Sequence, residues 1–160
     1  MERLIAFLPE TLPAQARVAI VHGDYRIDNV VFDGDGTLTA VLDWELATLG
    51  DPLADFSYLA MQWMMPADGG AGLGGLDLGA LGIPPLEEII ERYSSASGVP
   101  VAATLDWYFA YNLFRLAGIV QGIKKRVIDG TASHAQAADM AKRVPMLAQA
   151  AWSFAVKAGA

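Results

Sequence analysis

A run of polar residues in the first third of the chain has the types and spacing that phosphoryl transfer requires. His22, Asp24 and Asn29 follow one another in the order H-x-D-x-x-x-x-N, and Asp43 ends the second apolar segment after them. Phosphoryl transfer depends mainly on positioning and charge neutralisation, so a protein must supply a base and oxygen ligands for a metal ion. Asp24 is predicted to accept the proton of a substrate hydroxyl group, or to orient that hydroxyl for attack.

Two further oxygen-bearing side chains suit a metal ion on the phosphates. Mg²⁺ prefers hard oxygen ligands and takes several of them from phosphate and water. One amide and one carboxylate match this preference, so Asn29 and Asp43 are predicted to bind Mg²⁺ together with ATP or another nucleoside triphosphate. His22 is given a supporting role, because its ring can hydrogen-bond nearby backbone and fix the loop.

Short strands are expected to position these side chains. A strand over residues 17–21 leads into the loop, and strands over residues 29–32 and 39–42 form a hairpin. The turn between them is Gly34-Asp35-Gly36. A helix should open at Asp51, with Pro52 at its first helical position, and run to about Met65.

The other expected elements are helical, so the chain is predicted to be mainly α within the α+β class. A short N-terminal helix should stop at Pro9, and a helix over residues 84–97 should end near Gly98. A long helix is expected over residues 104–128. Ser133 and Gln136 form a capping box for a last helix, which Pro145 should kink rather than end.

These motifs resemble a known superfamily. Residues 22–58 resemble the aminoglycoside phosphotransferase and choline kinase superfamily, which shares the protein-kinase-like fold. Residues 41–55 (VLDWELATLGDPLAD) and 114–126 (FRLAGIVQGIKKR) are similar to its acyl-CoA dehydrogenase-associated branch. The resemblance extends from about Val18 to the C-terminal helix and implies a C-terminal lobe with a small β-hairpin at its active edge. Trp44-Glu45 stands where many protein kinases have Phe-Gly.

The resemblance also implies roles for individual residues. Asp24 corresponds to the catalytic aspartate, and Asn29 and Asp43 correspond to the metal ligands. Asp55 resembles the carboxylate that braces the catalytic loop through backbone hydrogen bonds. Arg26 is assigned a supporting role in the same loop.

A phosphatase of the haloacid dehalogenase type is the main rival interpretation. Asp33 and Asp35 follow an apolar strand as D-x-D-G-T, and Asp51 with Asp55 imitates an acidic motif of that class. That chemistry also needs a lysine between the two motifs, and the first lysine of the chain is Lys124. The motifs are also too close for a parallel crossover connection, which takes a dozen or more residues. We therefore favour the hairpin over the phosphatase interpretation.

Two weaker patterns are set aside. The hairpin turn also resembles the start of an EF-hand loop, but Leu38 replaces the required glycine and Trp44 the bidentate glutamate. Residues 70–75 match G-x-G-x-x-G, yet a helix precedes them and residues 76–84 are broken by glycine and proline. We expect a mobile linker there rather than a nucleotide site.

Two polar residues of the long helix are candidates for substrate contact. Arg115 lies among apolar residues, so we expect it to be buried, and Asn112 lies one turn earlier on the same face. A buried charge is normally paired, because an unpaired one is costly. A structural ion pair with Asp51, Asp55 or Asp106 is therefore the alternative to a substrate contact.

Composition limits the other functions. The 160 residues carry a net charge of -7 and no cysteine, and 54% of them are hydrophobic. We expect a single domain over residues 1–160 that binds no nucleic acid through phosphate contacts. The most apolar stretch, residues 107–123, is too short and too polar to span a membrane. No signal peptide is visible, so a cytoplasmic location is expected.

The chain lacks part of what a kinase-like enzyme uses. Only 21 residues precede His22, and none of them is a lysine, so we expect the N-terminal nucleotide lobe to be absent. The predicted function is ATP-dependent phosphorylation of a small-molecule hydroxyl, and the family branch implies a hydroxyacyl-CoA or similar hydroxylated substrate. Activity of the isolated chain stays open. The alternative is a non-catalytic ligand- or partner-binding module, with self-association through the surface left by the missing lobe.

Overall fold

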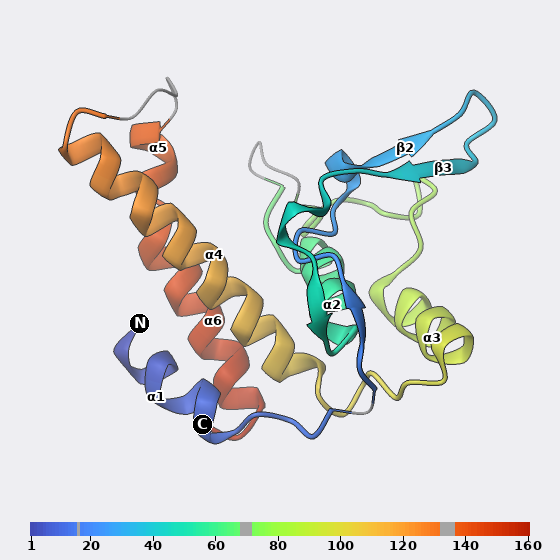
Figure 1. Ribbon diagram of the computed structural model, residues 1–160, viewed down its shortest axis with the longest axis horizontal. Coiled ribbons are helices and arrows are strands. Elements are labelled where there is room, and N and C mark those ends of the chain that lie inside the picture. Colours follow the sequence, from blue (N-terminus) through green and yellow to red (C-terminus); the bar gives the residue numbers. More distant parts are fainter. Residues whose placement is uncertain (16, 68–71, 132–136) are drawn as a thin grey trace. The chain divides into compact units, whose positions relative to one another are not determined.

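The structure of the protein is a computed structural model that describes residues 1–15, 17–67, 72–131 and 137–160. Most elements are helices, and the strands form two antiparallel pairs (Figure 1). The chain divides into two compact units. Unit 1 comprises residues 1–13 and 106–160, and unit 2 comprises residues 14–105.

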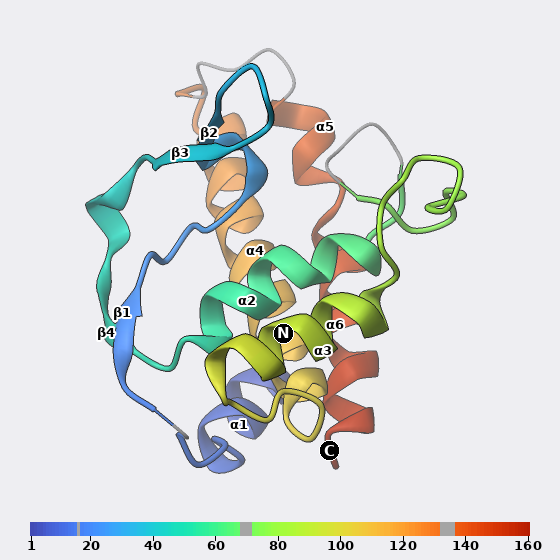
Figure 2. The same cartoon turned by 90° about the vertical axis from the view of Figure 1, so that its right-hand side faces the viewer.

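The strands of unit 2 form two separate ribbons (Figure 2). In the first, β1 (Ala19–Val21) pairs with β4 (Thr48–Gly50), and Ile20 lies opposite Leu49. In the second, β2 (Val30–Phe32) pairs with β3 (Leu38–Val41), and Val30 lies opposite Val41. The hairpin and the strand before the loop are thus confirmed, whereas β4 lies where no strand was predicted. Short 3₁₀ turns, η1 (Ile27–Asn29) and η2 (Trp44–Leu46), lie just before β2 and shortly after β3.

Asp33 builds the turn between β2 and β3. Its Oδ1 accepts hydrogen bonds from the backbone N–H groups of Asp35 at 3.0 Å and Thr37 at 2.8 Å. Its own backbone N–H donates to the Thr37 carbonyl at 3.0 Å. A side chain that bonds its own turn in this way is a recurrent turn former, which favours the hairpin interpretation over a phosphatase nucleophile.

The helices of unit 2 differ in detail from the prediction. The helix expected from Asp51 to Met65 is shorter: α2 spans Leu53–Ala60, and the 3₁₀ turn η3 (Met61–Trp63) follows it. Asp51 lies before the helix, where its Oδ1 accepts the Leu53 N–H at 2.9 Å. The next helix, α3 (Leu86–Ser97), ends at Gly98 in the left-handed conformation, as predicted.

The glycine-rich segment after η3 makes backbone hydrogen bonds in its described part. Residues 68–71 lie outside the described residues, so part of the G-x-G-x-x-G match does too. Leu73 donates its N–H to the Gln62 carbonyl at 2.8 Å, and Gly74 donates to the Met65 carbonyl at 2.7 Å. The segment therefore folds back on the end of the helical region.

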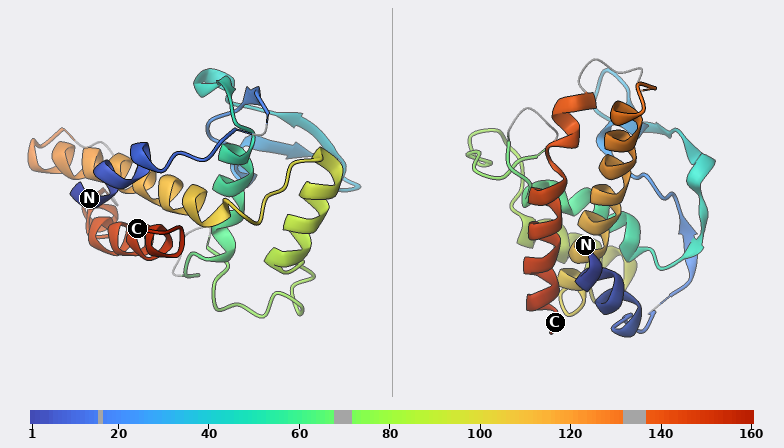
Figure 3. Two further views of the ribbon diagram at one scale, coloured as in Figure 1. Left: turned by 90° about the horizontal axis from the view of Figure 1, so that it is seen from below. Right: turned by 90° about the vertical axis from the view of Figure 1, so that its left-hand side faces the viewer.

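Unit 1 is helical and includes both ends of the chain. Figure 3 shows α1 lying against α4 and α6. Leu4 and Leu8 of α1 are buried, and the Phe7 ring meets Trp152 of α6 edge-on at 6.5 Å. None of the helices in the described ranges combines the length and hydropathy that a membrane crossing needs. The helices of this unit are α1 (Glu2–Glu10), α4 (Leu105–Ile128), α5 (Ala137–Ala141) and α6 (Val144–Lys157).

Two prolines behave differently from the prediction. Pro9 lies inside the last turn of α1 and does not end the helix before it, because Thr11 closes that turn through two bonds to the Phe7 carbonyl. Pro145 does not kink one helix. It lies in the first turn of α6, where the missing N–H has no intrahelical partner to lose. The predicted capping box at Ser133 and Gln136 lies outside the described residues.

Candidate active site

The loop that carries Asp24 is fastened at its start by Asp55. The two carboxylate oxygens of Asp55, in the first turn of α2, accept the backbone N–H groups of His22 at 2.5 Å and Gly23 at 2.9 Å. A carboxylate that accepts two backbone N–H groups makes charge-assisted hydrogen bonds, which are stronger than neutral ones. The structure therefore gives Asp55 the bracing geometry that the resemblance implied.

The buried ring of His22 links the loop to the strand beside it. Nδ1 accepts the backbone N–H of Asp24 at 3.2 Å, so Nδ1 carries no proton. Nε2 must then donate to the Leu42 carbonyl, which lies 2.6 Å away. The ring of His22 thus joins the loop to the residue before Asp43.

Asn29 closes the loop onto Asp24. Its amide nitrogen donates to the backbone carbonyl of Asp24 at 2.8 Å and to Asp24 Oδ2 at 3.2 Å. Because both bonds use the amide nitrogen, the amide oxygen Oδ1 is the atom that can bind a metal ion. The arrangement leaves Asp24 half-buried, with a carboxylate whose position is set from two sides.

The hairpin brings Asp43 beside Asn29. The Leu42 N–H donates to the Asn29 carbonyl at 2.8 Å, so the residue before Asp43 is hydrogen-bonded to Asn29 itself. Asp43 has φ 65° and ψ 52° and is, among the described residues, the one non-glycine residue with positive φ. Such conformations are uncommon, cluster at functional sites and persist where the surroundings enforce them.

A cation also lies in this loop. The Arg26 guanidinium is ion-paired with Asp28, and both side chains are substantially exposed. The pKa of Arg26 is raised above its ordinary value, first by the hydrogen bond to Asp28 and further by the negative charges of Asp28 and Asp24. Arg26 is therefore a permanent positive charge on the loop that carries Asp24.

The carboxylates of Asp51 and Asp55 also act on a side chain of α3. Tyr93 of α3 stacks on Phe56 of α2 with ring centroids 4.2 Å apart. Its pKa is raised above 10.0 by burial, and then by the negative charges of Asp51 and Asp55. No sequence pattern links Tyr93 to this site, because nearly forty residues separate it from Asp55 along the chain.

Gly23 and Trp44 also belong to the site, although sequence reasoning gave neither a role there. Gly23 has φ 84°, and a Cβ atom on it would lie 2.6 Å from the Leu46 carbonyl oxygen. The Trp44 ring lies 4.7 Å from the His22 ring, and its Nε1 donates to the Val41 carbonyl at 2.8 Å. The H-G-D and D-W spacings could have suggested both residues.

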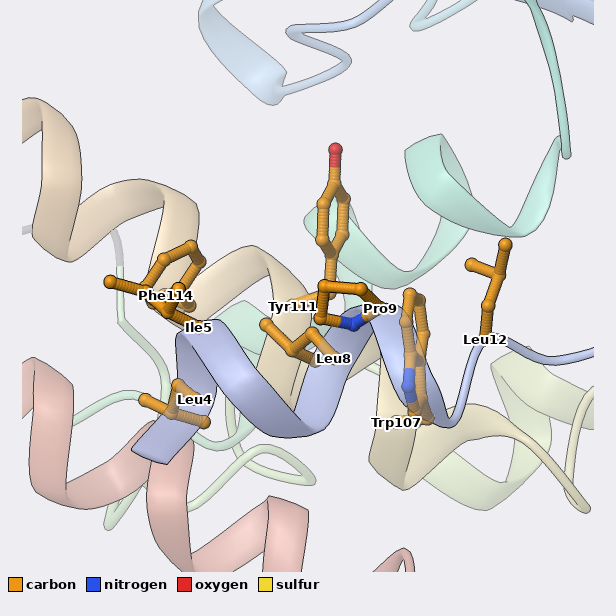
Figure 4. A pocket seen from close by; sticks show the side chains of 8 residues that line it. All are labelled: Leu4, Ile5, Leu8, Pro9, Leu12, Trp107, Tyr111 and Phe114. Carbon is orange, nitrogen blue, oxygen red and sulfur yellow. The ribbon is translucent and has the colours of Figure 1, made fainter. Parts of the chain in front are cut away.

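The two predicted substrate residues lie in unit 1. Asn112 of α4 is buried, whereas Arg115 is half-buried and thus less covered than predicted. A cavity of about 350 Å³ also lies in unit 1, and Figure 4 shows its lining and the Tyr111 hydroxyl pointing away from α1. Its lining, from α1, the residue Leu12 and α4, includes neither substrate candidate; the side chains are Leu4, Ile5, Leu8, Pro9, Leu12, Trp107, Tyr111 and Phe114.

The donor set suits Mg²⁺ better than a metal held wholly by protein. In the described ranges, no group of three or more His, Cys, Asp or Glu side chains could hold a metal ion. One amide oxygen and one carboxylate, from Asn29 and Asp43, form a small hard-oxygen set of the kind that Mg²⁺ completes with phosphate and water. The residues present therefore fit Mg²⁺ bound together with a nucleotide.

A braced aspartate loop, a hairpin and a second aspartate, carried on a mainly helical framework, define a kinase-like fold. The chain belongs to the phosphotransferase enzyme family, whose sequence pattern matches residues 1–94. A crystal structure of a Ralstonia eutropha protein, described as an aminoglycoside phosphotransferase, superimposes with a TM-score of 0.90 at 44% identity. That match covers 98% of this chain and 48% of the Ralstonia chain.

Similar curated proteins are much longer. Acyl-CoA dehydrogenase family member 10 of Mus musculus is 43% identical over 162 residues, which cover 99% of this chain and 15% of the mouse protein. Acyl-CoA dehydrogenase family member 11 of Gallus gallus is 36% identical over 155 residues, which cover 93% of this chain and 20% of the chicken protein. The chain thus spans a fifth or less of these relatives.

Proposed function

We propose that this chain carries the base and the metal ligands of an ATP-dependent phosphotransferase that acts on a small-molecule hydroxyl group. The main support is a set of hydrogen bonds around the loop. Asp55 accepts the backbone N–H groups of His22 and Gly23, Asn29 donates to Asp24, and the residue before Asp43 donates to the Asn29 carbonyl. In this proposal the base and one oxygen ligand come from the loop over residues 22–29, and the second oxygen ligand comes from the residue after the hairpin. Family membership supports the same reaction class.

Each residue has a distinct task in this proposal. Asp24 accepts the proton of the substrate hydroxyl, or orients that hydroxyl toward the phosphorus atom. Asn29 Oδ1 and an Asp43 carboxylate oxygen would hold Mg²⁺, which neutralises the charge on the nucleotide phosphates when bound. Arg26 places positive charge on the same loop, and Asp55 keeps the loop in position.

We further propose a hydroxyacyl-CoA or a related hydroxylated compound as substrate. The similar mouse and chicken proteins are named as acyl-CoA dehydrogenase family members. A kinase acting on a hydroxyacyl thioester would be chemically related to acyl-CoA metabolism. ATP as donor, Mg²⁺ as metal and a cytoplasmic location belong to the same proposal.

The test uses the longest natural polypeptide that contains this sequence. Phosphate transfer from Mg²⁺–ATP to a panel of hydroxyacyl-CoA and other alcohol acceptors is followed by mass spectrometry. Asp24→Asn should lower kcat by about 10²–10⁴-fold, because a positioned base contributes that much. Asparagine also tolerates the left-handed conformation, so Asp43→Asn removes the charge without straining the backbone. This variant should bind Mg²⁺ more weakly and need more Mg²⁺ for transfer.

A matched control separates this proposal from the phosphatase interpretation. Asp35→Asn removes one charge from the exposed hairpin turn and should leave transfer unchanged. A phosphatase nucleophile motif would instead lose its acid in that variant. Transfer that survives Asp24→Asn would contradict the assignment of Asp24.

The exposed ribbon of β1 and β4 favours a second candidate, binding of a partner or of a second copy. Val18, Ile20 and Leu49 expose 64%, 68% and 73% of their surfaces. Large apolar surfaces of this kind often mark interaction sites. Light scattering should then detect association of the protein. Ile20→Lys should abolish this association, and Asp43→Asn should leave it intact. A monomer at all concentrations, with no partner retained, would contradict the second candidate.

A further inference from the structure

Asp43 has a left-handed conformation, and both of its neighbours make contacts with other residues of the site. A positive φ is disfavoured for a residue with a Cβ atom, so isolated Asp43 would relax toward negative φ. On one side, Leu42 is fixed by the Asn29 carbonyl at 2.8 Å and by His22 Nε2 at 2.6 Å. The other neighbour, Trp44, has to fix the chain direction after Asp43.

Trp44 makes two contacts that meet this requirement. Its indole N–H donates to the Val41 carbonyl at 2.8 Å, so a side chain bridges the two residues that flank the Leu42-Asp43 pair. Its ring also lies 4.7 Å from the His22 ring, at an interplanar angle of 56°. The first contact closes a small loop around Asp43, and the second ties that loop to the segment of Asp24.

The two contacts are not explained by burial of Trp44. Half of its surface is exposed, and η2, which it begins, has three residues and no buried member. The Trp44 side chain is therefore half exposed, although its N–H donates to the carbonyl of Val41, two residues before Asp43. Loss of a group that orients a metal ligand typically lowers metal affinity by about 10–100-fold.

We propose that Trp44 is a positioning residue, whose indole bridge and contact with His22 hold Asp43 at positive φ and so set the distance between the Asp43 carboxylate and Asn29. The inference rests on the proposed function where it concerns the metal. The conformational part concerns Asp43 alone and can be tested without any metal.

Two variants of Trp44 and a matched control separate the contribution of the indole N–H from that of the ring. Trp44→Leu removes both contacts, whereas Trp44→Phe keeps a ring for His22 and removes only the N–H. The control is Trp63→Leu, because the Trp63 indole donates to the Pro84 carbonyl at the same 2.8 Å within the same unit. Trp63→Leu therefore reports the general effect of losing such a bond.

The first readout is Mn²⁺ binding, measured by electron paramagnetic resonance in the presence of a non-hydrolysable ATP analogue with the longest natural polypeptide. Trp44→Leu should raise the Kd for Mn²⁺ by about 10–100-fold, the usual effect of losing a residue that orients a metal ligand. Trp44→Phe should lie between Trp44→Leu and the wild type, and Trp63→Leu should match the wild type. Equal Kd values in Trp44→Leu and Trp63→Leu would overturn the proposal.

The second readout is the backbone conformation of Asp43, obtained by NMR from its amide-to-Hα coupling and intraresidue NOE. The wild type and Trp63→Leu should show positive φ, and Trp44→Leu should average toward negative φ. Unchanged positive φ in Trp44→Leu would overturn the inference. If φ changes as expected but the wild type binds no Mn²⁺ with the nucleotide, the proposed function fails and the role of Trp44 stands.

Discussion

Gly23, between His22 and Asp24, shows how little room the site leaves for change. Its φ of 84° disfavours any side chain, and a Cβ atom would lie 2.6 Å from the Leu46 carbonyl oxygen, which cannot move away as a flexible side chain could. The loop therefore approaches the backbone of η2 at van der Waals distance. A substitution there would displace Asp24 and η2 together.

Gly23→Ala should destabilise the fold by more than the conformational cost of about 1–3 kcal/mol for a strained residue, because the steric conflict adds to it. Gly36→Ala isolates the conformational cost, since Gly36 has φ 81° and open space around it. Gly34→Ala has neither problem and should be close to neutral. Urea unfolding followed by circular dichroism ranks the three; equal losses in Gly23→Ala and Gly36→Ala would remove the steric argument.

The polar residues of the site could be predicted from the sequence, but their geometry could not. The order of His22, Asp24, Asn29 and Asp43 along the chain carries the chemistry of the proposed reaction. The bond between His22 and the Leu42 carbonyl and the positive φ of Asp43 depend instead on residues that lie twenty positions away or across the hairpin. No local pattern encodes such a contact, so these features appear only in three dimensions.

At the scale of elements, periodic segments were predicted well and short ones poorly. The helices α3 and α4 begin and end within two residues of the predicted bounds, because glycine and a long apolar pattern mark them. The strand β4 has only three residues and no alternation, and it exists through its pairing with β1. Pro145 was misjudged because the chain turns at Lys142 and Arg143, before the proline is reached.

The helix α1 provides a test of unit 1. Leu4 is 1% exposed, whereas its neighbour Ile5 is 59% exposed on the same helix. Leu4→Ala should therefore lower the free energy of unfolding by about 2–5 kcal/mol, through lost burial and the cavity left behind. Ile5→Ala is the matched control and should change it by roughly 0.5 kcal/mol or less. Denaturant unfolding measures both, and equal effects would mean that α1 does not pack as described.

At the scale of the whole molecule, the chain matches only part of much longer relatives. It covers 48% of the Ralstonia chain and 15% of the mouse protein. For this reason the tests above use the longest natural polypeptide that contains the sequence.

Net charge also acts at this scale. An excess of acidic residues, -7 in total, disfavours nonspecific binding to nucleic acid and helps keep the protein dispersed. An anionic substrate such as an acyl-CoA would meet this charge on approach. Local cations such as Arg26 would therefore have to attract it at the site itself.

The bonds from Asp55 have a consequence for the timescale on which the catalytic loop moves. Backbone amides in loops usually exchange their hydrogens with solvent quickly, because they open often. The amides of His22 and Gly23 are instead tied to α2 through Asp55 and should open only when that anchorage breaks. Hydrogen–deuterium exchange should find both among the slow amides of unit 2, and Asp55→Ala should make them fast. Rapid exchange in the wild type would show that the loop opens independently of α2. Slow exchange would mean that the loop has its binding conformation before a substrate arrives.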